Sequence, residues 1–160
     1  MGSIGYSRIG LTYQPSDVCT TGIPVLRSGN IQNQEISFDN LIRVNRDVPD
    51  NLLVKNGDIL ICVRNGSKSL VGKNAIIHSI TEKVTFGAFM AIFRSNINHY
   101  VKLYLDSPIF KMVLKSVNTE TINQITQGNL NQALIPIPPI KEQERIIRKI
   151  TSLSEIIVGL

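Results

Sequence analysis

Residues 59–63 are the stretch that most constrains the fold of this chain. They read Ile-Leu-Ile-Cys-Val, a continuous apolar run rich in β-branched side chains that follows a turn-forming Asn-Gly-Asp. Such a run predicts a strand that is covered on both faces and lies centrally in its sheet. Six small, polar or basic residues follow at 64–69, and the apolar pattern resumes at 70–71 and 75–77. The stretch therefore predicts a β-hairpin with a long, basic loop.

Length and composition fit a single globular domain. The 160 residues are 42% hydrophobic and 18% charged, which is ordinary for a chain with a sizeable core. No apolar run approaches the roughly 18 residues of a membrane helix, and the first residues lack a signal-peptide pattern. We therefore expect a cytoplasmic protein with no membrane partner. Cys19 and Cys62 are far apart in the sequence, which supports neither a disulfide scaffold nor a zinc site.

The basic residues gather in the middle of the chain. Residues 59–119 hold eight Lys or Arg and two Asp or Glu, whereas the rest of the chain holds nine and ten. This distribution favours a polyanionic partner such as nucleic acid. A protein can also be basic without such a partner, so charge alone leaves both interpretations open.

Three polar segments carry side chains suited to DNA. Arg can contact guanine edges and Asn or Gln can contact adenine edges in bidentate fashion, and Lys can neutralise phosphates. The hairpin loop offers Arg64, Asn65, Ser67 and Lys68; the end of a strand predicted at 23–26 offers Arg27, Ser28 and Asn30; and residues 119–131 offer Thr126, Gln127 and Asn129. The competing interpretation of the second segment is a solvated turn. For the third it is a helix-capping turn, which the local sequence favours.

Strands and helices follow in the second half. Residues 85–93 predict one apolar strand with Gly87 inside it, where core packing is a more probable role for the glycine than a bulge. A helix is expected at 98–105, and Ser107-Pro108 restarts a second one, because Ser is a good N-cap and Pro is tolerated at the first helical position. The helical spacing of its apolar residues predicts a buried face made of Ile109, Met112 and Val113.

A helix is also expected after Pro138-Pro139. Its apolar residues are spaced 4, 3, 4 and 3, which is a heptad pattern over about two heptads: Ile146, Ile150, Leu153, Ile157 and Leu160. This seam predicts a partner helix, from a second copy or from another segment. The alternative is that the helix folds back on its own domain.

In order along the chain, the sequence resembles a target-recognition domain of the specificity (S) subunit of type I restriction-modification systems. The segments that carry the resemblance are GLTYQPSD, IPVLRSGNIQ, VKNGDILICVRNGS, LVGKNAII, TFGAFMAIFRS, YLDSPIF and INQITQGNLNQALIPIPPIKEQERII. The last segment is the most diagnostic, because in this family it joins a recognition domain to the long spacer helix. Each motif alone is weak, but the ordered set is specific.

The resemblance implies an α+β fold, with a single target-recognition domain at residues 1–139 built from a mixed, twisted β-sheet and packed helices. Residues 140–160 would begin the spacer helix of a coiled coil. It also implies a non-catalytic DNA-binding module without a cofactor of its own. Its partners would be double-stranded DNA, a type I methyltransferase (modification) subunit that methylates adenine N6, and a restriction subunit. The family's S subunit holds two recognition domains, so one domain here implies a fragment or a half-length subunit that forms a homodimer through its C-terminal helix.

Within this interpretation the polar residues divide into two roles. Lys68, Lys73 and Arg94 would neutralise phosphates, which gives affinity with little sequence information. The residues facing base edges would be Arg27, Asn30, Arg64, Asn65, Gln127 and Asn129.

The rival functions are an enzyme that acts by itself and a protein-interaction module. A self-sufficient adenine methyltransferase needs an Asn/Asp-Pro-Pro-aromatic motif, and here Pro138-Pro139 lies between two isoleucines. A nuclease of the Asp…Asp/Glu-x-Lys type fails because no acidic residue is followed two positions later by Lys. His78 and His99 stand alone in the sequence, which supports neither a metal site nor an acid-base cluster. The other rival is a protein-interaction module that docks the methyltransferase subunit without reading DNA.

Overall fold

The computed structural model describes residues 1–117 and 124–158, with all side chains in these ranges except those of residues 114–117, 155, 157 and 158. The strands are β1 (Tyr6–Ile9), β2 (Val18–Cys19), β3 (Ile23–Leu26), β4 (Ile31–Gln32), β5 (Glu35–Ile36), β6 (Ile42–Val44), β7 (Ile59–Cys62), β8 (Asn74–Ile76), β9 (Thr85–Phe86) and β10 (Met90–Arg94). The helices are α1 (Asn98–Asp106), α2 (Pro108–Val117), α3 (Gln127–Gln132) and α4 (Ile140–Val158).

Strand β7 lies inside a sheet and is buried on both faces, as its sequence predicts. The sheet has the order β1-β10-β7-β8 with antiparallel neighbours. Ile59 and Ile61 face a core shared with the helices, and Leu60 and Cys62 face a second core on the other side. The predicted hairpin forms, with β8 as its second strand. Leu70, where the β pattern is expected to resume, lies instead in a short 3-10 helix (Lys68–Leu70) within the loop.

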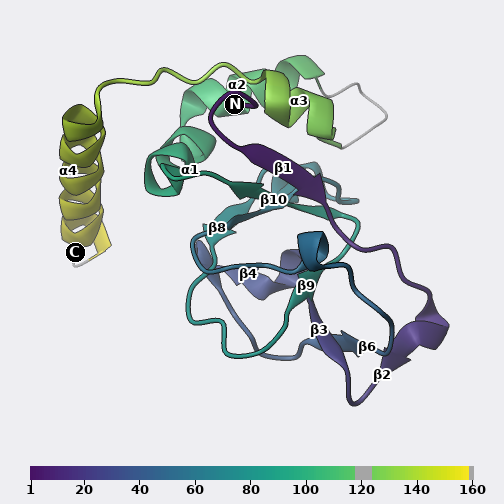
Figure 1. The fold of residues 1–160 in the computed structure, drawn as a ribbon. Coiled ribbons are helices and arrows are strands. Elements are labelled where there is room, and N and C mark those ends of the chain that lie inside the picture. The colour runs from purple at the N-terminus through teal and green to yellow at the C-terminus, as the bar shows by residue number, and fades with distance from the viewer. Residues whose placement is uncertain (118–123, 159–160) are drawn as a thin grey trace.

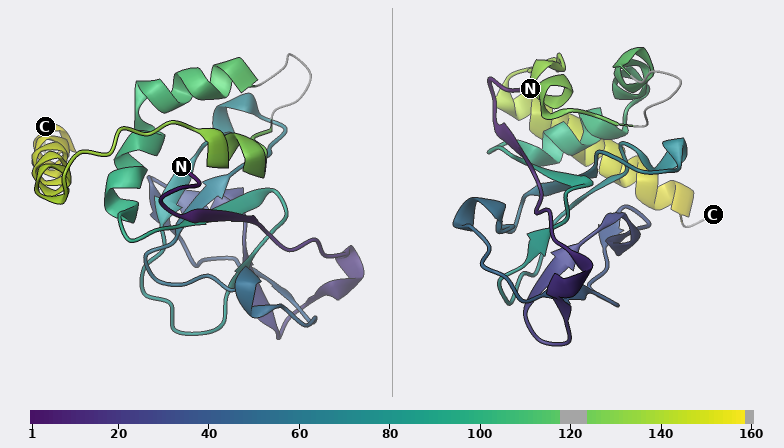
Figure 2. Two further views of the ribbon diagram at one scale, coloured as in Figure 1. Left: turned by 45° about the horizontal axis from the view of Figure 1, so that its top comes forward. Right: turned by 90° about the vertical axis from the view of Figure 1, so that its right-hand side faces the viewer.

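The molecule has three layers (Figures 1 and 2). Helices α1, α2 and α3 cover one face of the first sheet through Val101, Phe110 and Leu130, which join its core. A second sheet, of order β2-β6-β3-β9, packs against the opposite face. Its β3 and β9 are parallel whereas β3 and β6 are antiparallel. The mixed sheet and packed helices confirm the predicted α+β class.

The prediction of one strand over residues 85–93 is wrong. Strand β9 ends at Phe86 in the second sheet, and β10 begins at Met90 in the first. A tight turn joins them, closed by a 2.8 Å hydrogen bond from the Met90 amide to the Gly87 carbonyl. The residues on either side are apolar and buried in both sheets, so the hydrophobic pattern continues through the turn and hides it.

The buried stripe predicted for α2 is also partly wrong. Ile109 and Met112 are exposed, whereas Phe110 is fully buried and Val113 packs partly against the core. The helix is apolar on more than one side, so its sequence does not single out the buried face. The predicted restart at Ser107 is confirmed, because its hydroxyl accepts a hydrogen bond from the Phe110 amide at 3.3 Å.

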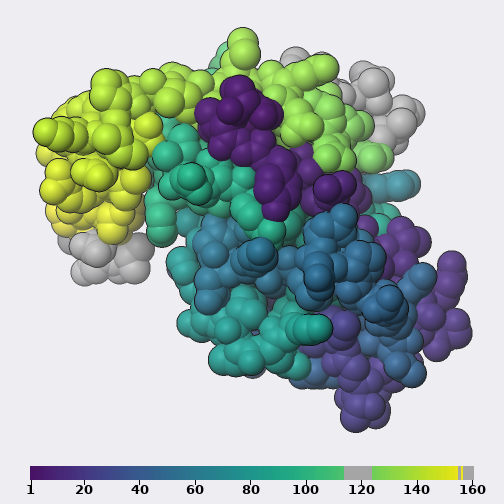
Figure 3. Space-filling view, in the orientation of Figure 1, coloured from purple at the N-terminus to yellow at the C-terminus, as the bar shows by residue number. Residues whose placement is uncertain are grey.

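Helix α4 lies at one side of the molecule (Figure 3) and contacts α1. The extended segment before it is held on α1 by a 3.0 Å hydrogen bond from the Tyr100 hydroxyl to the Pro136 carbonyl. The Gln143 side chain is buried and donates to the Pro138 carbonyl at 2.8 Å. Beyond these first turns Ile150 and Leu153 are 40% and 48% exposed. The beginning of α4 is therefore anchored, and its later apolar residues are uncovered.

An ion pair closes one end of the first sheet. Asp58 is 1% exposed, and Arg94 reaches it with Nε and Nη2 at 2.6 and 2.5 Å. The guanidinium also donates to the Tyr6 hydroxyl at 2.6 Å. These hydrogen bonds, chiefly those with Asp58, raise the pKa of Arg94. Arg94 therefore neutralises a buried carboxylate.

Replacing Arg94 with methionine should lower the free energy of unfolding by about 3–5 kcal/mol, because a buried carboxylate would lose its partner. Urea denaturation measures this loss. The double variant Arg94→Met/Asp58→Asn should recover part of it. The exposed control Lys68→Met should change stability by less than about 0.5 kcal/mol. Equal losses for Arg94→Met and Lys68→Met would contradict the structural role of Arg94.

Candidate nucleic-acid interface

Three loops meet at one end of the two sheets because of the strand pairing. Strands β3 and β9 run parallel with Leu26 opposite Phe86, so the residues that follow them, Arg27 and Gly87, lie at the same end. The Gly87 amide donates to the Leu26 carbonyl at 3.0 Å. Strands β7 and β10 are antiparallel with Cys62 opposite Met90, so the residues after β7 lie beside those before β10. The sheet register alone therefore brings together loops 27–30, 64–70 and 87–89.

Side chains and backbone connect these loops. The Phe89 carbonyl accepts hydrogen bonds from the amides of Val63 at 2.9 Å and Arg64 at 3.1 Å. The Arg64 guanidinium carbon lies 5.2 Å from the centroid of the Phe89 ring, which is a cation–π distance. The Asn65 amide donates to the Ser28 hydroxyl at 3.2 Å. Four of the residues predicted from sequence thus come together: Arg27, Ser28, Arg64 and Asn65.

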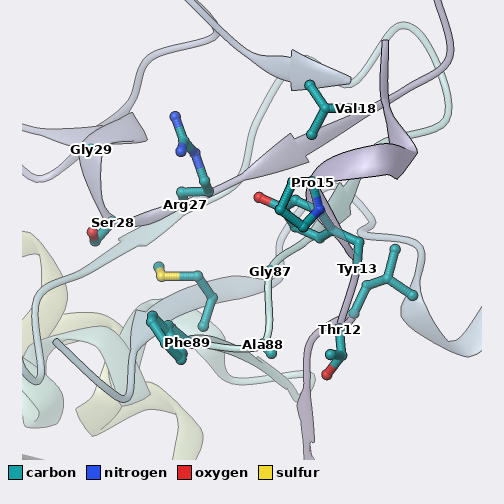
Figure 4. Close-up of a pocket in the computed structure, with 12 residues that line it drawn as sticks. Thr12, Tyr13, Pro15, Val18, Arg27, Ser28, Gly29, Gly87, Ala88 and Phe89 are labelled. Atoms are coloured by element: carbon teal, nitrogen blue, oxygen red, sulfur yellow. The ribbon is translucent and has the colours of Figure 1, made fainter. Parts of the chain in front are cut away.

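Loops 27–30 and 87–89, together with residues of the segment 11–18, line an open pocket of about 770 Å³. Figure 4 shows Arg27 and Ser28 on one side of it, Tyr13 and Pro15 on another, and Phe89 at its border. Its walls are mainly apolar, and its guanidinium comes from Arg27. A pocket of this kind, beside further cations, suits a ligand that is both anionic and aromatic.

The cations of these loops have no acidic partner among the described residues. Arg27, Arg64 and Lys68 are exposed and belong to none of the five ion pairs in the described ranges. By contrast Arg43, Arg46 and Arg94 are each paired with a carboxylate. The positive charge of loops 27–30 and 64–70 therefore remains available to an external anion.

Asn30 does not reach this surface. It is 6% exposed, and its Oδ1 accepts the Arg27 amide at 3.0 Å. Its Nδ2 donates to the carbonyls of Ser37 and Asp39, both at 3.2 Å. The expectation that Asn30 faces a base edge is therefore corrected, because all of its amide is used to hold the loop that presents Arg27.

The segment around Thr126 caps a helix. The Thr126 hydroxyl accepts the Asn129 amide at 3.1 Å, and Asn129 Oδ1 accepts the Thr126 amide at 2.9 Å, which makes a reciprocal capping box at the start of α3. Gln127 donates to the Ser7 carbonyl at 2.6 Å. The capping interpretation is confirmed. The segment still lies beside the loops, since the Ile125 amide donates to the Val63 carbonyl at 2.7 Å.

The predicted phosphate-binding residues are spread over the molecule. Lys68 is exposed on the 64–70 loop, where Ser67, a further candidate for DNA contact, is exposed too. Lys73 follows that loop and lines a separate pocket of about 320 Å³ with Asp106 and Lys111. Arg94 lies one register step beyond the Phe93–Ile59 pair, at the opposite end of β7 from Arg64. The expectation that Arg94 neutralises a phosphate is therefore corrected, because its charge is paired with the buried Asp58.

No metal-holding group of three or more His, Cys, Asp or Glu occurs in the part of the chain that the structure describes. His78 and His99, which are distant in sequence, stack with their ring centroids 6.4 Å apart on the surface. Burial raises the pKa of the Cys62 thiol, which makes it a poor metal ligand or nucleophile. None of the helices within the described residues is long and apolar enough to span a bilayer.

Comparison with known proteins identifies the family. Residues 13–159 match the type I restriction modification DNA specificity domain. The chain belongs to this family. The match confirms the resemblance carried by the sequence motifs.

Two curated relatives are similar to this specificity domain over most of its length. The EcoKI specificity subunit of the type I restriction enzyme of Escherichia coli K12 is 30% identical over 136 residues, which cover 82% of this chain and 29% of the relative. The StySPI specificity subunit of Salmonella potsdam is 29% identical over 136 residues, with the same coverages of 82% and 29%. The chain thus spans less than a third of the length of these curated relatives.

Solved structures share its fold. The HsdS subunit from Thermoanaerobacter tengcongensis superposes with a TM-score of 0.71 at 20% identity, covering 99% of this chain and 37% of that subunit. A chain from a structural study of complex assembly and conformational transition in the type I R-M system superposes with a TM-score of 0.74 at 20% identity. The superposition covers 99% of this chain and 38% of that longer chain.

Sequence reasoning missed two residues of the candidate interface, Tyr13 and Phe89. Phe89 falls within the stretch taken for a buried strand, so it passed for a core residue. The small residues Gly87 and Ala88 before it were the available signal of a turn. Nothing in the local sequence around Tyr13 points to the pocket. The bridge between Leu11 and Gly87, which are far apart in the chain, brings this segment to the pocket.

Asn30→Ala should lower the free energy of unfolding of the specificity domain by about 1–3 kcal/mol, since it leaves the Arg27 amide and two carbonyls without partners. Urea denaturation measures this change. Asn51→Ala, the same substitution at an exposed position, should stay within about 0.5 kcal/mol of the unaltered domain. A loss no greater than that of the control would show that Asn30 is not structural.

Proposed function

We propose that the chain binds double-stranded DNA in a sequence-specific manner, as a specificity subunit or part of one in a type I restriction-modification complex. The observation that carries the proposal is the convergence of Arg27, Arg64 and Lys68, without acidic partners among the described residues, on one surface of a specificity domain. Phosphate backbones attract such cations, and base edges accept hydrogen bonds from guanidinium groups.

The contacts within the loops suggest a division of roles. Lys68 is exposed on a 3-10 turn and supplies a point charge, which suits a phosphate. The Arg64 guanidinium lies over the Phe89 ring, and a guanidinium placed in this way suits the O6 and N7 atoms of guanine. Asn65 donates to the Ser28 hydroxyl and accepts the Ser67 amide. Its first role is therefore to hold loop 64–70 in shape and to connect it to loop 27–30. Arg27 is the second candidate for a base contact.

The proposal extends to partners. The chain itself would be non-catalytic, would act in the cytoplasm without a cofactor, and would direct a methyltransferase subunit to adenines and a restriction subunit to its sites. Residues 1–139 would form the recognition domain and residues 140–160 the start of the spacer helix. Support comes from the names of the relatives, which are specificity subunits of type I restriction enzymes.

Arg64→Ala should weaken binding to the preferred duplex by about 1–3 kcal/mol, which is the contribution of a bidentate base contact. Its affinity for random DNA should change little. Lys68→Ala should weaken binding to both duplexes alike. It should also reduce the magnitude of the slope of log K against log salt by about 1. Fluorescence anisotropy with a duplex selected from a random pool, at several salt concentrations, measures both effects. Ile109→Ala, an exposed change on α2, is the control.

Equal losses on selected and random DNA for both variants would defeat this division of roles. Binding that does not depend on salt, or no binding to any duplex, would favour the alternative function, a protein-interaction module that docks the methyltransferase subunit without reading DNA.

The C-terminal helix is proposed to pair two recognition domains. Ile146 is partly buried, and Ile150 and Leu153 leave an uncovered apolar seam on α4. The remaining seam residues, Ile157 and Leu160, have side chains outside the described residues. A second copy could cover the seam, and a two-fold symmetric pair would read a symmetric, split target.

Ile150→Asp/Leu153→Asp should convert a concentration-dependent dimer into a monomer, because two charges would be buried in a helix pair. Sedimentation equilibrium measures the association, with Thr151→Asp/Ser152→Asp as a control off the seam. In cells that also hold a cognate methyltransferase subunit, methylated adenines should map to a split palindrome. A chain that stays monomeric at all concentrations would contradict self-pairing, and an asymmetric motif would contradict the symmetric pair.

A further inference from the structure

Phe89 is exposed in the middle of a cationic surface. Its side chain is 56% exposed, although it sits between Arg64 and the pocket bordered by Arg27. Phosphate binding requires only positive charge, so it does not account for an uncovered aromatic ring at this place. The ring therefore points to a partner with an apolar group beside its anionic ones.

The backbone presents this ring rigidly. The Phe89 carbonyl is bonded to two consecutive amides at the end of β7, and the turn that precedes it is closed by the bond between Met90 and Gly87. The Arg64 guanidinium carbon lies over the ring, 5.2 Å from its centroid. A ring fixed in this way loses little side-chain entropy on binding, so it suits specific recognition of a partner.

The major groove of DNA offers one matching apolar group. The C5 methyl of thymine is the apolar feature by which a base pair can be told apart there, and Phe is among the side chains that contact it. Arg64 lies against the ring and would reach a neighbouring base edge. The pair of side chains thus matches two adjacent positions of a duplex, one with acceptors and one with a methyl group.

We propose that Phe89 reads the 5-methyl group of a thymine next to the base contacted by Arg64. This inference rests on the proposed function and makes Phe89 a specificity-determining residue of the DNA-binding surface. Arg27 and Ser28 line the same pocket as Phe89.

The test combines a change in the DNA with a change in the protein, as in a double-mutant cycle. The full chain first selects a preferred duplex from a random pool, and each thymine of that duplex is then replaced by deoxyuridine, which lacks only the methyl group. At one thymine the unaltered chain should lose about fourfold in affinity, the worth of one buried methyl. Phe89→Ala should bind the thymine and deoxyuridine duplexes equally. Phe89→Leu, which keeps an apolar side chain, should retain part of the preference.

Phe38→Ala is the matched control, since Phe38 is another exposed phenylalanine that does not line the pocket; it should keep the full preference. A selected duplex without thymine, indifference of the unaltered chain to deoxyuridine at every position, or an unchanged preference in Phe89→Ala would each overturn the inference. These outcomes leave the proposed function standing, because selection of a duplex has already demonstrated it. Failure to select any duplex defeats the proposed function itself, and the inference falls with it.

Discussion

The antiparallel pairing of β7 with β10 is the constraint on which the rest of the structure depends. It places Arg94 beside Asp58 at one end of the sheet and Phe89 beside Arg64 at the other. Both strands are buried on two faces, so a slip of one residue would exchange the two cores and is strongly disfavoured. One register therefore determines both the structural ion pair and the candidate interface.

The two ends of this sheet use the same residue type in different ways. Arg94 is surrounded by a buried carboxylate, a carbonyl and a phenol, and its charge is neutralised within the fold. The Arg64 guanidinium lies over an aromatic ring and stays exposed. Desolvation explains the contrast, because a carboxylate buried without a partner is costly, whereas an exposed guanidinium costs little and remains available.

Much of the fold could be predicted from local patterns, and less of the interface. The apolar run at 59–63 indicated a central strand, and the long basic loop after it was found where expected. The turn at Gly87 was not predicted, because the apolar residues on both of its sides continue one pattern although they belong to two different sheets. Asn30 and Asn129 carry the right chemistry for base contacts, yet the side-chain oxygen of each already accepts a hydrogen bond from a backbone amide. Composition does not reveal whether an amide is already bonded.

By itself the sequence determined the family, the α+β class, the buried hairpin and the basic character of the loop after β7, because these follow from periodicity and from the order of motifs. Only the tertiary structure decided which polar residues share a surface. Parallel pairing of β3 with β9 and antiparallel pairing of β7 with β10 bring Arg27, Arg64 and Phe89 together. Such neighbours lie far apart in the chain, so hydrogen bonds between strands place them, and local sequence carries no record of that pairing.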